Sequence, residues 1–328
     1  MRFASKFVSV VILLLAAGIA TAAPALPRLK AIKLAAHTYY FQGKAGMASQ
    51  QNRGFMSNAG FVVTPAGVVV FDALATPALG AAMRQAIREV TPQPVRTIII
   101  SHYHADHFYG LQALADKDTA IWAHGKARAT LQSDFTRERL AERRTSLAPW
   151  VDQNTRLVPA TRWLDFGAGR EIKFELGGVR FAVIDVGGAH SPEDLMLFVE
   201  NDRVLFAGDL FFTGRIPFVG EADSNAWLQA LQRIHASQPV AVVPGHGAAS
   251  TKPLADVELT RSYLLFLREQ MGKAVADMVD FDTAYKAVDW SRFSGYPAFN
   301  EANRLNAYGT YLLMERESLA APDSPTKE

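Results

Sequence analysis

The most constraining feature of this 328-residue chain is a short apolar run at residues 95–100 that leads into a cluster of metal-ligand side chains. The run is rich in isoleucine and valine and predicts a buried strand. Four of the next seven residues are ligand types: His102, His104, Asp106 and His107. A strand end is rigid, so the loop that leaves it can direct several side chains to one place. Imidazole nitrogens and carboxylate oxygens bind zinc or iron, so the cluster predicts a metal site.

Three further ligand types stand in similar places. His190, Asp209 and His246 each lie one to five residues beyond a predicted strand and beside a glycine, where the backbone can turn tightly. Any one of them alone is more typical of an ordinary turn. Together with the first cluster they complete a set of seven candidate ligands.

The chain alternates strands and helices, which is typical of an α/β fold. A hairpin is predicted at 61–63 and 68–71, and further strands at 120–123, 172–176, 178–185, 194–199, 203–207 and 241–244. Helices are predicted at 77–90, after Gly110, and at 225–235, 253–278 and 298–316, with an irregular segment at 281–297. The two halves share this order, which indicates two sheets packed face to face with helices outside.

The N-terminus is typical of a secretory signal peptide. Arg2 and Lys6 precede an apolar run at 8–17, and small residues follow up to Ala22, after which we expect cleavage. The run is short for a membrane span, which needs about 20 residues, although an uncleaved anchor stays open. Residues 1–22 are therefore predicted to be removed, leaving a periplasmic or secreted protein without a stable membrane span.

Composition excludes several classes of function. The chain has no cysteine, which rules out disulfides, thiol nucleophiles and thiolate ligands. Its net charge is +2, and loss of Arg2 and Lys6 would leave the mature chain near neutrality. Residues 137–144 alternate in sign, as a solvated helix face does. Without a basic stripe, no nucleic-acid partner is expected; the partner is a small-molecule substrate, and the oligomeric state is open.

These motifs resemble the metallo-β-lactamase fold superfamily. The matching pieces are His102-x-His104-x-Asp106-His107-x-x-Gly110, His190, Gly208-Asp209 and Pro244-Gly245-His246-Gly247, within residues 60–247. The resemblance implies a four-layer αββα sandwich at residues 23–255, followed by a C-terminal helical extension and polar tail at 256–328. It further implies two divalent metal ions, with zinc favoured and iron or manganese also compatible. One ion would take His102, His104 and His190, the other Asp106, His107 and His246, and Asp209 would bridge both.

The identity of residue 209 narrows the resemblance. β-Lactamase branches carry cysteine or serine at this position, whereas an aspartate is similar to glyoxalase II and related thioesterases. The export signal, Phe211-Phe212 and the C-terminal helices are similar to periplasmic metallohydrolases that accompany sulfur-oxidation systems and quinoprotein dehydrogenases. We find no basic glutathione-binding pattern in the C-terminal segment.

The ligand set predicts a hydrolase. Two metals ~3.5–4 Å apart can share one water and lower its pKa toward ~7, giving a hydroxide that attacks a thioester, ester or lactam carbonyl. Asp106 and Asp209 are the predicted catalytic residues, which orient the bridging hydroxide and are candidates to accept its proton. A mononuclear iron enzyme acting on persulfides, a β-lactamase and a non-enzymatic metal store stay open as alternatives.

Several weaker candidates have two interpretations. Asp72 either bonds a ligand histidine or serves as a turn or cap residue. Asn300, Asn303 and Asn306 share a helix face, with a solvated face favoured over a pocket lining. His37, His124 and His235 are expected to be core or surface residues, and loops 42–57 and 211–224 to control specificity. An apolar wall or ordinary core packing is expected for Phe211, Phe212, Phe218 and Trp227.

Overall fold

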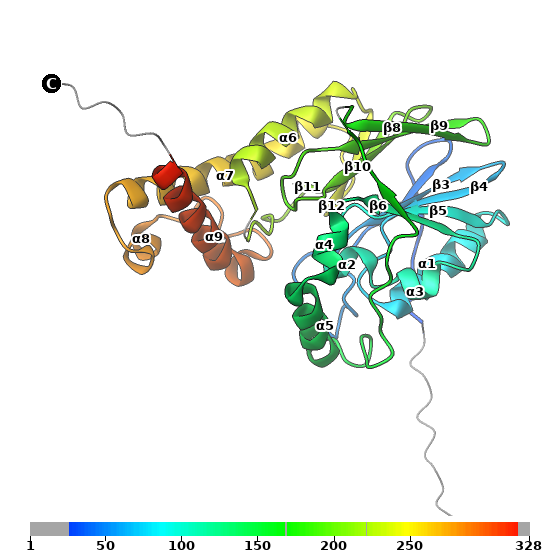
Figure 1. The fold of residues 1–328 in the computed structure, drawn as a ribbon, viewed down its shortest axis with the longest axis horizontal. Coiled ribbons are helices and arrows are strands. Elements are labelled where there is room, and N and C mark those ends of the chain that lie inside the picture. The colour runs from blue at the N-terminus through cyan, green and yellow to red at the C-terminus, as the bar shows by residue number, and fades with distance from the viewer. Residues whose placement is uncertain (1–25, 168, 221, 321–328) are drawn as a thin grey trace, which may run out of the picture.

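The computed structural model describes residues 26–167, 169–220 and 222–320 (Figure 1). The predicted signal peptide and its cleavage point after Ala22 lie outside the described residues, as does the end of the polar tail. Two β-sheets pack face to face, with helices on both outer faces, which confirms the predicted four-layer α/β sandwich with C-terminal helices.

The first sheet contains seven strands in chain order. They are β1 (Ile32–Lys33), β2 (Thr38–Phe41), β3 (Ala59–Thr64), β4 (Gly67–Phe71), β5 (Val95–Ile99), β6 (Ala120–His124) and β7 (Arg162–Leu164). Strands β1 to β4 pair antiparallel, whereas β4 to β7 run parallel. The carboxyl ends of β4 and β5 therefore open at the same edge, and the loops that follow them meet there.

The second sheet has five strands in the order β12-β11-β10-β9-β8. They are β8 (Glu171–Leu176), β9 (Val179–Asp185), β10 (Leu195–Val199), β11 (Val204–Phe212) and β12 (Ala241–His246). Strands β11 and β12 pair parallel, so their carboxyl ends also share one edge.

Helices cover the outer faces of both sheets (Figure 1). Helix α1 (Pro77–Val90) matches the prediction because Thr76 caps it, accepting from the Leu79 amide, and Pro77 suits its first turn. The other helices are α2 (Ala105–Phe108), α3 (Leu111–Leu114), α4 (Ala127–Gln132), α5 (Asp134–Ser146), α6 (Ser224–Ala236), α7 (Pro253–Ala276), α8 (Phe281–Ala287) and α9 (Phe299–Ala320).

The central core lies between the two sheets. Phe71 of the first sheet stacks on Phe206 of the second, with ring centroids 5.6 Å apart. Ile99 and Leu197 are fully buried in the same layer. Each such side chain contributes about 1.5–3 kcal/mol through burial, so the layer holds the two sheets in a fixed relation. This packing brings the carboxyl ends of β4 and β5 opposite those of β11 and β12.

Three sequence predictions need correction. Strand β11 does not end at residue 207 but continues to Phe212, because pairing with β12 resumes after a register shift at Gly208, whose φ is +53°. Strand β12 likewise reaches His246. The segment 281–297 is not wholly irregular, since it contains α8, which Asp280 caps by accepting from the Thr283 amide.

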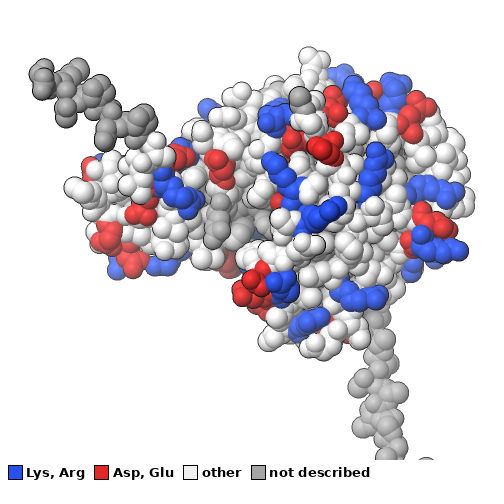
Figure 2. Space-filling model, viewed as in Figure 1, with Lys and Arg blue, Asp and Glu red and all other residues white. Residues whose placement is uncertain are grey.

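The predicted division of the chain at residue 255 falls in the first turn of α7 and stays a prediction. No helix within the described ranges is long and apolar enough to cross a membrane. On the face in Figure 2, basic side chains are interspersed with acidic ones.

Two glycines allow α1 to approach the loop after α2. A Cβ on Gly80 would lie 2.1 Å from the Gly110 carbonyl oxygen, closer than real contacts allow. We therefore expect Gly80→Ala to lower the free energy of unfolding by about 1–3 kcal/mol, measured by chemical denaturation of the metal-loaded protein.

The control for this substitution is Gly272→Ala within α7, where the nearest atom to a new Cβ is the Met314 methyl at 3.4 Å. Alanine should be tolerated there, because it suits a helix interior better than glycine by about 0.5–1 kcal/mol. Equal stability of the two variants would contradict the close approach.

Candidate metal centre

All seven predicted ligand residues converge at the shared edge of the two sheets. Three groups have ligand atoms that all lie within 4.8 Å of one another, and each group combines residues from both sheets. The groups are His102, His104 and His190; His102, His107 and Asp209; and Asp106, His107 and His246. The loop after β5 supplies His102 and His104, and α2 supplies Asp106 and His107. The loop after β9 supplies His190, and β11 and β12 supply Asp209 and His246.

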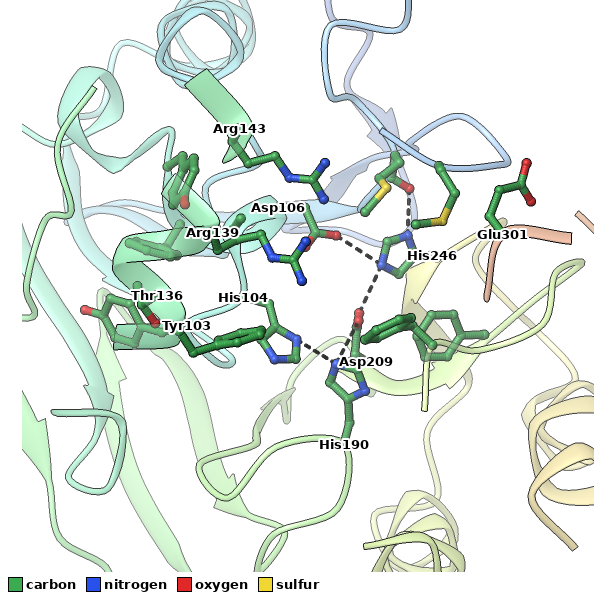
Figure 3. A pocket seen from close by; sticks show the side chains of 18 of the residues that line it. Tyr103, His104, Asp106, Thr136, Arg139, Arg143, His190, Asp209, His246 and Glu301 are labelled. Atoms are coloured by element: carbon green, nitrogen blue, oxygen red, sulfur yellow. Dashed lines mark hydrogen bonds and ion pairs between the residues drawn. The ribbon is translucent and has the colours of Figure 1, made fainter. Parts of the chain in front are cut away.

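Asp209 lies between the two histidine groups (Figure 3). Its Oδ2 is 3.3 Å from Nε2 of His190, whereas its Oδ1 is 3.1 Å from Nε2 of His107 and 3.3 Å from Nε2 of His246. One carboxylate oxygen thus faces each group. This is the arrangement that a carboxylate bridging two cations requires.

The hydrogen bonding of the cluster fits metal ions. Within the described residues, no hydrogen-bond partner exists for His102 Nε2, Asp106 Oδ2, His107 Nε2, His190 Nδ1 or Asp209 Oδ1, although all are buried. His104 Nδ1 and His190 Nε2 face each other at 2.9 Å. Buried polar atoms without partners are costly, and facing ring nitrogens need a shared cation or proton. The donor set of five imidazoles and two carboxylates at one point suits divalent zinc, iron or manganese.

The pKa values of the ligand residues also indicate a site that favours bound cations. Burial, with the neighbouring histidines, lowers the pKa of His102 far below its usual value and that of His104 to about 3, so both stay neutral ligands. Burial works against ionisation of Asp209, but His246 and His107 hold its pKa well below the usual range. The carboxylates are therefore charged, and divalent cations would balance them.

Asp72 orients two of the ligand histidines. Its Oδ2 lies 2.8 Å from Nδ1 of His107 and also accepts from the Ser101 hydroxyl, which in turn lies 3.0 Å from Nδ1 of His102. Both Nδ1 atoms therefore carry the proton, and both Nε2 lone pairs point into the cluster. Of the two interpretations of Asp72, the structure supports the contact with a ligand.

A second support holds His246. Its Nδ1 lies 2.9 Å from the Met56 carbonyl, which again directs Nε2 at the cluster. Asn58, which the sequence did not single out, donates to the carbonyls of Pro244 and Gly247 and so fixes the turn that carries His246. Gly245 leaves room for Asp209, since a Cβ there would lie 1.9 Å from its Oδ1.

Aromatic side chains form an apolar wall beside the ligands. Phe212 stacks on His246 with ring centroids 5.1 Å apart and an interplanar angle of 4°, and Trp227 meets His190 edge-on at 5.2 Å. Phe218 lines the pocket in front of the cluster, whereas Phe211 belongs to the core. The predicted apolar wall is thus correct for Phe212 and Phe218, and the predicted core packing is correct for Phe211.

The pocket in front of the cluster is lined partly by the two predicted specificity loops, through Met47, Met56, Phe212, Arg215 and Phe218. Helix α5 adds Arg139 and Arg143, and α9 adds Glu301 and Leu305. The alternating charges at residues 137–144 predicted a solvated face for α5. The i, i+4 spacing of Arg139 and Arg143 indicates only that these two side chains share a side of the helix. Which side faces the pocket depends on how α5 packs against α2.

The asparagines of α9 serve the fold instead. The prediction of a solvated face is wrong for Asn303 and Asn306, which are buried. Asn306 accepts from the Val219 amide and donates to the Pro217 carbonyl, and Asn303 accepts from the Tyr263 hydroxyl. Asn306 thus fixes α9 to the loop that carries Phe218, and Asn303 fixes it to α7. Asn300 is exposed.

The other histidines lie outside the cluster. His37 pairs with Asp202 at 2.9 Å, and His124 lies 3.6 Å from Asp185. The side chain of His235 is outside the described residues.

Comparison with known proteins identifies the family. A model described as the metallo-β-lactamase superfamily matches residues 52–246, which is more than half of the chain. The chain therefore belongs to the metallo-β-lactamase superfamily.

Two curated proteins are similar over part of their length. The 2,4-dinitroanisole O-demethylase subunit alpha of Nocardioides sp. (strain JS1661) is 28% identical over 184 residues, covering 55% of this chain and 49% of the relative. The β-lactamase-like protein 2 homolog of Drosophila melanogaster is 24% identical over 169 residues, covering 50% and 49%. The chain thus spans about half the length of the curated relatives it matches.

Solved structures share the fold. A metallo-β-lactamase from Pontibacter korlensis aligns with a TM-score of 0.54 and 19% identity, covering 73% of this chain and 99% of that one. The inverting sec-alkylsulfatase Pisa1 from Pseudomonas sp. aligns with a TM-score of 0.64 and 15% identity, covering 90% of this chain and 52% of that one. At these identities the likeness concerns architecture alone.

The role of Asp72 can be tested by metal affinity. We expect Asp72→Asn to weaken metal binding about 10–100-fold in chelator competition, because His107 and the Ser101–His102 pair lose the carboxylate that orients them. Asp202→Asn is the matched control, since Asp202 is a buried, histidine-paired aspartate away from the cluster. Equal metal affinity of the two variants would disprove the orienting role.

Proposed function

We propose that this protein is an exported, binuclear metal-dependent hydrolase that cleaves a thioester, ester or lactam of a small molecule. The observation that carries the proposal is the position of Asp209, whose two carboxylate oxygens face two different histidine groups. A site built for one ion would have no use for the second group, Asp106, His107 and His246.

His102, His104 and His190 would hold one ion, Asp106, His107 and His246 the other, and Asp209 both. When bound, two divalent ions supply a water of lowered pKa and Lewis-acid polarisation of a carbonyl oxygen. Zinc is the proposed metal, and iron and manganese suit the same donors. Both aspartates line the pocket, and Asp106 is the more accessible, with 14% of its side chain exposed against 5% for Asp209. It is therefore the better placed of the two to take a proton from a reacting water, while Asp209 is committed to the centre of the cluster.

The aromatic side chains of the apolar wall limit which molecules can enter the pocket. Phe212 and Phe218 line the pocket beside the ligands, which limits bulk water near the reacting carbonyl. The aspartate at position 209 favours the glyoxalase II-like and periplasmic metallohydrolase branches over the β-lactamases. The names of two similar proteins add two further substrate types to consider, an aryl methyl ether and an alkyl sulfate.

The proposal is tested by assaying metal-quantified protein on a panel of thioesters, lactones and β-lactams, with 2,4-dinitroanisole and an alkyl sulfate included. Hydrolysis with two metal ions per chain is expected. One iron per chain with oxygen uptake on a persulfide would overturn it in favour of the mononuclear alternative. Two metal ions without turnover of any panel member would favour a metal store.

The bridging role of Asp209 gives a sharper test. Asp209→Ala should remove most of the hydrolysis, about 10²-fold or more, and lower the bound metal below two equivalents, because both histidine groups lose a shared ligand. Asp202→Ala, a buried aspartate remote from the cluster, should retain both. Full activity of Asp209→Ala with two bound metals would refute the bridging role.

Export is proposed from residues 1–22, whose pattern is that of a signal peptide. N-terminal sequencing of protein recovered from a cell that secretes it should find Ala23 first. A chain that retains Met1 in the membrane fraction would instead be an anchored protein.

A further inference from the structure

The pocket holds basic side chains that the metal chemistry does not use. Arg139 and Arg143 stand one turn apart on α5 and line the pocket together with the ligand Asp106. Figure 3 shows both guanidinium groups pointing from α5 into the pocket, on the side of Asp106. Arg143 is the more enclosed, with 16% of its side chain exposed against 36% for Arg139. A guanidinium that is largely withdrawn from water retains a strong preference for an anionic partner.

Tyr109 offers a third hydrogen-bond donor near Arg139 and Arg143. Tyr109 lines the pocket, and its buried hydroxyl finds no hydrogen-bond partner among the described residues. A tyrosine hydroxyl is protonated at neutral pH, so Tyr109 can donate a hydrogen bond. A buried hydroxyl without an acceptor is costly, and a ligand oxygen would satisfy it.

The acidic side chains near these cations are either exposed to solvent or predicted metal ligands. Glu142 is the acidic neighbour of both arginines, at 3.2 Å from Arg139 and 3.6 Å from Arg143, but its side chain is 46% exposed and turned to solvent. Arg215 adds a further buried positive charge beside His246 at 3.3 Å. Glu301 is the other acidic residue that lines the pocket besides the ligands, and it is exposed. The three arginines match Asp106, Asp209 and Glu301 in formal charge, so bound divalent ions would give the pocket an excess of positive charge.

We infer that the substrate carries an oxyanion group, a carboxylate or a sulfonate-like group, that Arg139, Arg143 and Tyr109 bind while the bond to be cleaved lies against the metal centre. This inference deepens the proposed function by naming the substrate class of the same site. The guanidinium groups match a planar carboxylate through paired N–H donors, and the tyrosine hydroxyl donates a further hydrogen bond. The three residues are specificity-determining and do not touch the reacting carbonyl. A neutral ester of the same length would bind only through the metals and the apolar wall.

Binding can be tested without turnover. Isothermal titration calorimetry of the metal-loaded protein would compare N-phenylsuccinamate with its neutral counterpart N-phenylbutyramide, both of which carry an amide in place of a reactive ester. The anionic amide should bind at least about tenfold more tightly, because charge-assisted hydrogen bonds contribute that much or more. The corresponding sulfonate shows whether the site distinguishes a planar from a tetrahedral oxyanion. Equal affinity of the charged and neutral amides would overturn the inference.

Variants of the pocket residues show whether the anionic group of the ligand binds to the arginines or directly to the metal ions. Arg143→Gln and Tyr109→Phe should each weaken the anionic amide, by about 10–100-fold for the arginine and less for the tyrosine, and leave the neutral amide within about twofold. Arg137→Gln is the matched control, since it removes one charge from an exposed position of the same helix that does not line the pocket. If all three variants bind the anionic amide as the native protein does, the carboxylate sits on the metals and the inference is wrong.

Kinetics with matched esters distinguish this inference from the proposed function. The selectivity for 4-nitrophenyl hemisuccinate over 4-nitrophenyl butyrate, as a ratio of kcat/KM, should fall about 10–100-fold in Arg143→Gln while butyrate turnover stays constant. If neither ester is cleaved but the anionic amide still binds through Arg143, the hydrolase proposal fails and the anion site stands. If both esters are cleaved with a ratio that Arg143→Gln does not change, the hydrolase proposal stands and the anion site fails.

Discussion

The contact of Asp209 with histidines from three separate segments is the constraint on which the site depends. Its two carboxylate oxygens reach His190 on one side and His107 and His246 on the other. These residues are far apart in the chain and meet because the two sheets pack face to face, with Phe71 stacked on Phe206. The carboxyl ends of the parallel strand pairs then open at one edge, where short loops can deliver ligands from both sheets.

Concentrating buried polar groups at one point is costly unless each is held and paired. In this protein, hydrogen bonds from residues around the site hold the ligand histidines in position. Asp72 and Ser101 orient His107 and His102, and the Met56 carbonyl orients His246. Each contact engages Nδ1 and directs Nε2 at the centre of the cluster. Most of the buried atoms without a partner in the described residues are Nε2 of His102 and His107 and carboxylate oxygens of Asp106 and Asp209, the atoms that would bind the ions.

Much of the fold and of the ligand set could be predicted from local sequence patterns. The strand at 95–100 and the capped helix at 77–90 were predictable because their signals lie within a few residues. Features that depend on distant partners were not. Asn303 and Asn306 looked solvated because their partners, Tyr263 and the 217–220 loop, are 40 or more residues away. Arg139 and Arg143 looked like one side of a solvated helix, since nothing near them in the chain shows that α5 turns this side to the pocket.

The central claim is that the ligand set holds two ions that share Asp209. Anomalous diffraction from crystals of the metal-loaded protein, recorded on both sides of the metal absorption edge, tests it most directly. Two peaks about 3.5–4 Å apart are expected, one beside His102, His104 and His190 and one beside Asp106, His107 and His246, with Asp209 between them. A single peak at full metal loading, with one histidine group left without a metal, would contradict it.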